Sequence, residues 1–167
     1  MAPSRLHVVR RLSPGFLAIM PHPAAGPQLT VELQALRRSG VELLVSLLDA
    51  HESADLGLAD AASVCAQCGI EHRSHPVADM STPADGPAFT ALARSLKHRL
   101  LAGAGIAIHC RAGIGRSGLL AASVLVACGA KPEEAFAEIS RARGASVPEV
   151  PAQGRWLEQH QQALVAE

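Results

Sequence analysis

Short apolar runs alternate with amphipathic segments along most of this 167-residue sequence. Each run ends at glycine, proline or a charged residue and is too short for a typical helix, so it predicts a buried strand. These strands are expected at residues 16–20, 41–48, 70–77 and 106–109. Residues 1–14 come before them and are expected to be a loosely held lead-in, with residues 15–167 as a single domain.

The segments between the runs have apolar residues three or four positions apart, which predicts helices. These helices are expected at residues 30–39, 56–68, 88–101, 118–128, 132–143 and 154–166. Alternation of strands and helices indicates an α/β fold, with a central, mostly parallel sheet of four to five strands and helices on both faces. Ligands of such folds bind beyond the carboxyl ends of the strands, so the loops there are the candidates for a functional site.

The composition narrows the classes of protein that this chain can belong to. Apolar residues make up 49 % of it, which is enough for a core and excludes a disordered chain. Fifteen basic residues balance fifteen acidic ones, so no nucleic-acid partner is expected. The longest apolar run, residues 119–130, is too short for a membrane span. Four cysteines are too few for a disulfide scaffold, so free thiols in the cytoplasm are expected.

The loop after the last expected strand carries the most specific pattern in the chain. It reads His109-Cys110-Arg111-Ala112-Gly113-Ile114-Gly115-Arg116-Ser117. Five residues between the cysteine and the second arginine can curl into a cradle of inward-pointing backbone N–H groups, and the glycines permit the tight turns. The cradle ends where a helix begins, which favours an anion, and Arg116 adds a two-pronged grip on phosphate oxygens.

Cys110 would lie at the floor of this cradle, where the N–H groups and the arginine favour a thiolate at neutral pH. A thiolate there can attack phosphorus and form a phosphocysteine, while Arg116 stabilises the transition-state charge. Ser117 would donate a hydrogen bond to the sulfur and make it a better leaving group. His109 is expected to orient the loop, and residues 111–115 are expected to bind the substrate phosphate.

This loop resembles the signature loop of the cysteine-dependent phosphatases, the protein-tyrosine and dual-specificity superfamily. Residues 112–118 are like those of the tyrosine phosphatases, whereas residues 20–23, 45–48 and 76–79 are similar to the compact, kinase-associated-phosphatase type. The resemblance spans residues 15–160. It implies a phosphomonoester hydrolase that works through a phosphocysteine, without a metal or another cofactor.

A phosphatase of this kind also needs a general acid to protonate the leaving oxygen. Asp79 directly follows an expected strand and has the place of the family's acid, although Val77-Ala78 stands where the family has a tryptophan. Asp85 is the alternative, but its position just before a helix also suits an N-cap.

Two further residues are candidates for substrate handling. Gln153 follows a proline-containing loop, as does the glutamine that positions the hydrolytic water in larger relatives; the alternative is an exposed glutamine at a helix start. Arg111 is expected at the pocket mouth, where it would meet a second phosphate or an acidic residue. Phosphoinositide and inositol-phosphate phosphatases often have a basic residue there, with a second one where this chain has Ile114.

The substrate is expected to be a phosphorylated protein or a small phosphomonoester. The chain has no tyrosine, which deep phosphotyrosine pockets use, so a protein tyrosine/dual-specificity phosphatase with a shallow pocket is the main interpretation. A phosphoinositide or inositol-phosphate phosphatase, a non-catalytic phosphate-binding module and a rhodanese-like sulfurtransferase are the alternatives. The sequence does not predict an oligomeric state.

Cysteines and histidines between residues 65 and 75 have a spacing that invites a zinc hypothesis: Cys65, Cys68, His72 and His75. The two histidines lie at an odd separation on an expected strand and would face opposite sides, so core cysteines and surface histidines are expected instead. A second hypothesis is that Cys65 or Cys68 traps an oxidised Cys110 as a disulfide.

Overall fold

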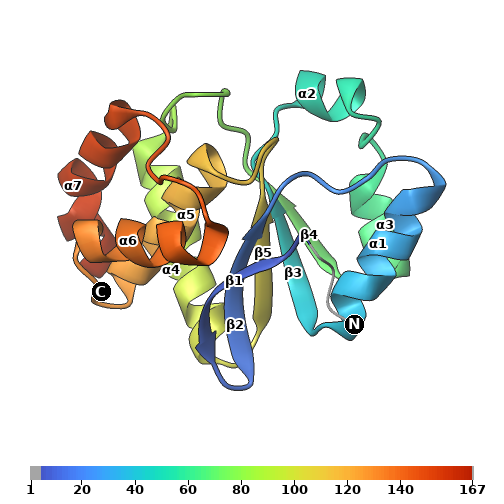
Figure 1. The fold of residues 1–167 in the computed structure, drawn as a ribbon, viewed down its shortest axis with the longest axis horizontal. Helices are drawn as coiled ribbons and strands as arrows, with labels where there is room; N and C mark the ends of the chain where they lie inside the picture. The colour runs from blue at the N-terminus through green and yellow to red at the C-terminus, as the bar shows by residue number, and fades with distance from the viewer. Residues whose placement is uncertain (1–4, 167) are drawn as a thin grey trace.

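A five-stranded sheet with helices on both faces makes up the computed structural model, which describes residues 5–166 (Figure 1). Its strands are β1 (His7–Leu12), β2 (Gly15–Met20), β3 (Val41–Ser46), β4 (Glu71–Ser74) and β5 (Gly105–His109). The strand order is β1-β2-β5-β3-β4; β1 is antiparallel to β2 and the other pairs are parallel. The expected α/β fold with a mostly parallel sheet is therefore confirmed.

The helices pack on both faces of the sheet (Figure 1). We call the face that is covered by more helices the thick side and the opposite face the thin side. The thick side contains α4 (Gly86–Leu101), α5 (Gly115–Ala127), α6 (Pro132–Arg143) and α7 (Pro151–Val165). The thin side contains α1 (Pro27–Arg38) and α3 (Ala61–Gln67), and the short α2 (Ala50–Asp55) lies beyond the carboxyl end of β3. None of the helices in the described chain is long and apolar enough to span a bilayer.

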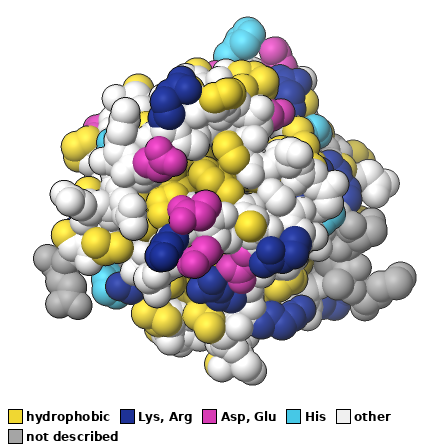
Figure 2. All heavy atoms as spheres, turned by 60° about the vertical axis from the view of Figure 1, so that its left-hand side comes forward, with side chains coloured by type: hydrophobic (Ala, Val, Ile, Leu, Met, Phe, Trp, Pro, Cys, Tyr) yellow, Lys and Arg dark blue, Asp and Glu magenta, His cyan; other side chains and the backbone are white. Residues whose placement is uncertain are grey.

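Each side has its own hydrophobic cluster. All residues of α5 are buried, because this helix lies between the sheet and the outer helices α4, α6 and α7. The cluster of the thin side is smaller and contains residues of α1, α3 and one face of the strands. The surface of the thick side mixes apolar, acidic and basic side chains and presents no area of a single charge (Figure 2).

The amino-terminal segment is more ordered than the sequence predicts. Residues 7–12 of the expected lead-in form β1, which pairs with β2 across a turn at Ser13-Pro14. Val9 is buried, and the guanidinium of Arg10 lies 2.6 Å from the carboxylate of Glu138 on α6. These long-range contacts hold the strand in place. Residues 1–4 of the expected lead-in lie outside the described part of the chain.

The helix expected at residues 56–68 is wrong in its first half. The chain instead forms α2 and α3, with a turn between them in which Gly57 has a φ of 70°. A capping box begins α2, because the Asp49 carboxylate accepts the backbone N–H of Glu52 and the Glu52 carboxylate accepts that of Asp49. This box fixes the start of α2 just beyond the carboxyl end of β3, at the edge of the sheet where the candidate site lies.

Candidate active site

The predicted loop lies at the carboxyl end of β5, the middle strand, and leads directly into α5. Cys110 follows the strand and Arg116 belongs to the first turn of the helix. The first N–H groups of a helix have no partner within it, and they concentrate positive potential at this end. The fold therefore places a cysteine and an arginine together at a position that favours an anion.

Cys110 and Ser117 are both buried, with the sulfur 3.2 Å from the serine hydroxyl. A serine hydroxyl can donate to a thiolate, which has only lone pairs to offer. Burial of both groups restricts their motion and keeps the contact in place. The pair thus has the geometry in which the hydroxyl stabilises negative charge on the sulfur.

Bonds from outside the loop hold its carbonyl groups. Arg143 of α6 donates from Nε to the carbonyl of Gly113 at 3.0 Å and from Nη2 to that of Ala112 at 3.1 Å. The backbone N–H of His22 donates to the carbonyl of Arg111 at 3.1 Å. In a trans peptide the N–H points opposite to the C=O, so the next N–H of each unit faces away from these partners. These bonds support a loop whose N–H groups turn inward.

The two glycines of the loop differ in their conformation and surroundings. Gly113 has a φ of 74°, and a Cβ there would overlap the backbone of Met20 and Pro21. Gly115 does not have a positive φ, so the expected left-handed conformation is found at Gly113 and not at this second glycine. A Cβ at Gly115 would meet the carboxylate of the exposed Glu149, which can move aside, and would lie 3.1 Å from the amide nitrogen of the buried Gln153, so a side chain here would crowd Gln153.

Arg116 is held by a glutamate that the sequence analysis did not identify. The two carboxylate oxygens of Glu52 lie 2.7 and 3.0 Å from Nη1 and Nη2 of the buried guanidinium. The hydrogen bonds from Arg116 lower the pKa of Glu52 and outweigh the effect of its burial. Burial opposes the charge of Arg116, but its bonds to Glu52 and the charges of Cys110 and Asp79 raise the pKa of the guanidinium. Both groups are therefore charged.

Asp79 also contacts the guanidinium of Arg116. Its Oδ1 is 3.1 Å from Nη2 of Arg116, and its side chain is 54 % exposed. Nη1 of Arg116 donates to Glu52 and to the carbonyl of Val77, and Nη2 donates once to Glu52. An arginine has five N–H bonds, so only one on Nη2 and the one on Nε are left for phosphate oxygens. A bound phosphate and Asp79 would therefore compete for Nη2.

Gln153 is fully buried, so the alternative of an exposed glutamine at a helix start is wrong. Its carbonyl oxygen accepts the backbone N–H groups of Glu149 and Val150 at 3.2 and 3.4 Å. Its amide nitrogen donates to the carbonyl of Ser81, two residues after Asp79. Gln153 also neighbours Gly115. It thus joins three segments, those of the candidate acid, the proline-containing loop and the phosphate loop.

His109 and Arg111 differ in their surroundings. His109 is buried, which lowers its pKa to about 4, and its neutral ring donates from Nδ1 to the carbonyl of Cys110 at 3.3 Å. Its own carbonyl accepts the N–H of Leu47 at 3.0 Å. Arg111 is about half exposed, and its Nε lies 3.5 Å from Glu52. The guanidinium of Arg111 is thus close to that of Arg116, with the same carboxylate between them.

The remaining candidates lie away from this arrangement. Asp85 caps α4 by accepting the N–H of Ala88 at 2.9 Å. Cys65 packs in the cluster of the thin side, whereas Cys110 belongs to that of the thick side. Burial raises the pKa of Cys65 to about 12, so this thiol stays protonated and does not suit the proposed disulfide with Cys110.

The residues of the zinc hypothesis are spread over two sides of the sheet. His75 packs edge-on against Phe89, a residue of the thick-side cluster, with 5.5 Å between ring centroids. His72 lines a cavity next to α3 on the other side. Both histidines are partly exposed, and Cys65 is buried while Cys68 is partly buried. Within residues 5–166, no three His, Cys, Asp or Glu side chains converge as a metal site would require.

Comparisons with known proteins place this geometry in a family. The chain matches the family model "Polymorphic toxin system, DSP-PTPase phosphatase" (Tc-R-P) over residues 19–130, which include Asp79 and the whole loop. No curated protein matches the sequence significantly.

Solved phosphatase structures share the fold over nearly the whole chain. Kinase associated phosphatase, with its catalytic-site cysteine replaced by serine, has a TM-score of 0.82 at 23 % identity and covers 98 % of both chains. Tk-PTP in the active form has a TM-score of 0.78 at 24 % identity, covering 95 % of this chain and 97 % of its own. PTPMT1 in complex with PI(5)P has a TM-score of 0.71 at 21 % identity, covering 89 % and 91 %.

Proposed function

Since this chain belongs to the DSP-PTPase family of cysteine-dependent phosphatases, we propose that it hydrolyses phosphomonoesters through a phosphocysteine on Cys110. The observation that carries this proposal is the convergence of Cys110, Ser117, Arg116 and Asp79 at the start of α5. These groups supply a nucleophile, a donor to its sulfur, a phosphate grip and an acid.

The first step transfers the phosphoryl group to sulfur. The Cys110 thiolate attacks phosphorus, the S–P bond forms and the P–O bond to the leaving group breaks. Asp79, protonated at this stage, gives its proton to the departing oxygen, which leaves as an alcohol or phenol. Arg116 and the N–H groups of the loop stabilise the charge on the other three oxygens. Binding of phosphate at Nη2 of Arg116 frees Asp79 for this role.

The second step releases phosphate. Asp79, now ionised, takes a proton from water as the water oxygen attacks phosphorus and the S–P bond breaks. Ser117 donates a hydrogen bond to the sulfur as it regains its negative charge. Gln153, which contacts both the loop and the Asp79 segment, positions this water. The enzyme returns to its starting protonation state.

We propose protein tyrosine/dual-specificity phosphatase activity with a shallow pocket. The absence of tyrosine from the chain supports this choice, because no tyrosine is available to line a deep phosphotyrosine pocket. A thiolate nucleophile works only while it is reduced, which suits the cytoplasm. All four cysteines are free, as this requires.

A phosphoinositide or inositol-phosphate phosphatase is the second candidate. It is favoured by the half-exposed Arg111 in the loop and by the shared fold with PTPMT1, which was solved in complex with PI(5)P. The Arg111→Ala variant tests it, with the exposed Arg38→Ala on α1 as a control. Turnover of inositol phosphates and phosphoinositides that depends on Arg111, while phosphopeptide turnover does not, would favour this candidate. Equal effects on both substrates would remove its support.

The primary test is phosphate release from p-nitrophenyl phosphate in the presence of EDTA and a thiol reductant. We expect activity that vanadate blocks and that is lost in Cys110→Ser. Cys128→Ser, at the opposite end of α5, is the matched control and is expected to retain activity. Acid quenching during turnover by Ser117→Ala is expected to trap phosphate on Cys110, visible by mass spectrometry. Full activity in Cys110→Ser would overturn the proposal.

A further inference from the structure

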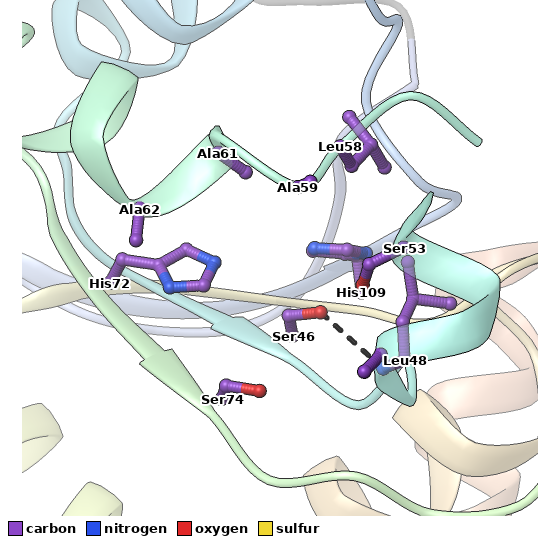
Figure 3. A pocket seen from close by; sticks show the side chains of 11 residues that line it. Ser46, Leu48, Ser53, Leu58, Ala59, Ala61, Ala62, His72, Ser74 and His109 are labelled. Atoms are coloured by element: carbon purple, nitrogen blue, oxygen red, sulfur yellow. Dashed lines mark hydrogen bonds between the residues drawn. The ribbon is translucent and has the colours of Figure 1, made fainter. Parts of the chain in front are cut away.

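A cavity lies behind the phosphate loop, on the thin side of the sheet (Figure 3). It has a volume of about 320 Å³ and lies at the carboxyl ends of β3, β4 and β5, next to α2 and the start of α3. Cys110, Arg116 and Asp79 do not line it. Its volume is near the lower end of the range of roughly 300–1,000 Å³ that is typical of small-molecule pockets.

The cavity has a polar wall and an apolar wall. Figure 3 shows imidazole and hydroxyl groups on one side and short apolar side chains on the other. The strand ends supply Ser46, His72, Ser74 and His109. The segment before α3 and its first turn supply Leu58, Ala59, Ala61 and Ala62. None of the lining residues is a lysine, arginine, aspartate or glutamate, so a bound charge would have no counter-charge.

The polar wall has hydrogen-bonding capacity that the described protein does not use. Nε2 of His72 is buried and has no partner in the described structure, which is rare because burial without a bond costs free energy. Nδ1 of His109 carries its proton toward the carbonyl of Cys110, so the other ring nitrogen of His109 is an acceptor. The hydroxyl oxygen of Ser46 accepts the N–H of Leu48 at 3.4 Å, which leaves its O–H able to donate.

Both imidazoles are neutral in this setting. Burial lowers the pKa of His72, and it lowers the pKa of His109 to about 4. The wall therefore combines donors and acceptors without a net charge. Such a wall can form hydrogen bonds with the edge of a heterocyclic ring that carries both N–H donors and nitrogen or oxygen acceptors. The leucine and alanines on the opposite wall can pack against the apolar face of the same ring.

We propose that this cavity binds a small, uncharged heterocycle of nucleobase size, held by His72 and the serines at its edge and by the Leu58 side at its face. The site would be separate from the phosphate-binding loop but next to it. His109 lines the cavity and precedes Cys110, and Ser53 lines it and follows Glu52, the partner of Arg116. The occupied cavity would thus contact residues adjacent to the catalytic groups on two elements.

The test is a titration of the full chain followed by ¹H–¹⁵N NMR. It uses Cys110→Ser protein, so that its outcome does not depend on the proposed phosphatase mechanism. The probes are adenine, nicotinamide and nicotinate, the last of which has the ring of nicotinamide but a carboxylate. We expect adenine or nicotinamide to shift the amides of residues 46, 61–62 and 72–74 saturably, with a Kd below about 1 mM. Nicotinate is expected to bind at least about tenfold more weakly than the better uncharged probe, because its charge has no partner.

Three variants locate the binding. Ala62→Leu puts a larger side chain into the cavity from an exposed position on α3 and is expected to abolish the shifts. Ala66→Leu, one turn later on the same helix and outside the cavity, is expected to leave them unchanged. His72→Phe keeps the ring but removes its nitrogens, and is expected to weaken binding about three- to tenfold. Circular dichroism checks that each variant is folded.

Three results would overturn the proposal: no saturable binding of adenine or nicotinamide by about 1 mM, nicotinate binding as tightly as either, or undiminished binding to folded Ala62→Leu. Each outcome is independent of phosphate release. Failure of the cavity proposal with intact vanadate-sensitive activity would leave the phosphatase mechanism in place, and the reverse result would leave the cavity in place.

Discussion

The helices on the thick side of the sheet are much more buried than those on the thin side. On the thick side, α5 is enclosed along its whole length, and three outer helices shield it from solvent. On the thin side, α1 and α3 form a single layer, and α2 buries only the side chain of Glu52. The candidate catalytic groups thus rest on two supports, of which the thin side is much less buried.

Arg116 is the residue at which the two supports meet. It belongs to the enclosed α5, but its guanidinium is held by Glu52 from the short α2. Cys110 packs in the thick-side cluster, and Ser117 is a buried residue of α5. Changes to the thick side are therefore expected to affect folding and chemistry together, whereas changes on the thin side can misplace Arg116 in a protein that still folds.

The largest effect is expected for Arg116→Lys. Lysine keeps the charge but cannot bind a carboxylate and a phosphate with parallel N–H pairs. Loss of this transition-state grip is expected to lower kcat/KM for aryl phosphates by about 10³-fold or more. Arg155→Lys, exposed on α7, is the control. A loss of kcat/KM of less than tenfold in Arg116→Lys would mean that phosphate binding does not need the parallel N–H pair of an arginine.

Next in size is the effect of Asp79→Ala. Loss of a general acid is expected to lower kcat about 10²-fold or more with phenyl phosphate, and less with p-nitrophenyl phosphate, whose leaving group needs less help. Vanadate is expected to bind more tightly, because Asp79 no longer competes for Nη2 of Arg116. Asp85→Ala removes only a helix cap and is expected to cost about 1 kcal/mol of stability with activity retained. Loss of activity in Asp85→Ala together with retained activity in Asp79→Ala would identify Asp85 as the general acid.

Glu52→Gln tests the support from the thin side. Removing one partner of a buried ion pair is expected to lower the free energy of unfolding by about 3 kcal/mol at pH 7, measured in urea. Because the pKa of Glu52 is lowered in the folded state, its contribution is present above its unfolded value of 4.5 and is lost as the pH falls through the folded value. The difference in the free energy of unfolding between Glu52→Gln and wild type is therefore expected to be smaller at about pH 3 than at pH 7.

Glu71→Gln is the matched control for this prediction. Glu71 also pairs with two arginines, Arg73 and Arg99, and this also lowers its pKa, but its side chain is 43 % exposed. Solvent screens such a pair, so the expected loss is at most about 1 kcal/mol. Equal losses in the two variants would show that burial of Glu52 adds nothing to the stability of the pair.

A smaller effect than that of Glu52→Gln is expected for Gln153→Leu. This change keeps the volume but leaves the N–H groups of Glu149 and Val150 without their acceptor, at a cost of about 1–3 kcal/mol. If Gln153 positions the hydrolytic water, breakdown of the phosphocysteine slows more than its formation, and a burst of product appears in stopped-flow traces. A loss of stability without such a burst would restrict Gln153 to a structural role.

Local patterns in the sequence predicted the sheet core and the phosphate loop, because both depend on neighbours in the chain. The run at residues 106–109 and the glycines after it gave the strand, the loop and the helix in the right order. The strand β1 was missed because its stability comes from β2 and from Glu138, far away in the sequence. Similarly, 64 positions separate Glu52 from Arg116, and no periodicity connects them.

Some of the missed features did leave a local signal. Asp49 and Glu52 have the spacing of a capping box, which predicts the start of α2, and Gly57 is a plausible break between two helices. The cavity next to α3 left none, because residues from three strands and two helices form it. Only the register of the strands brings His72 and His109 to the same edge of the sheet.

The engagement of Asp79 with Arg116 has a consequence for inhibitor design. An anion that binds Nη2 of Arg116 must displace the Asp79 carboxylate, and this carboxylate is then left without a cation. A molecule that carries a phosphate mimic and, close to it, a positively charged amine would supply both charges at once. The anion would take the place of Asp79 on Arg116, and the amine would pair with the released Asp79. Affinity for such a zwitterion, compared with its uncharged-amine analogue, would depend on Asp79.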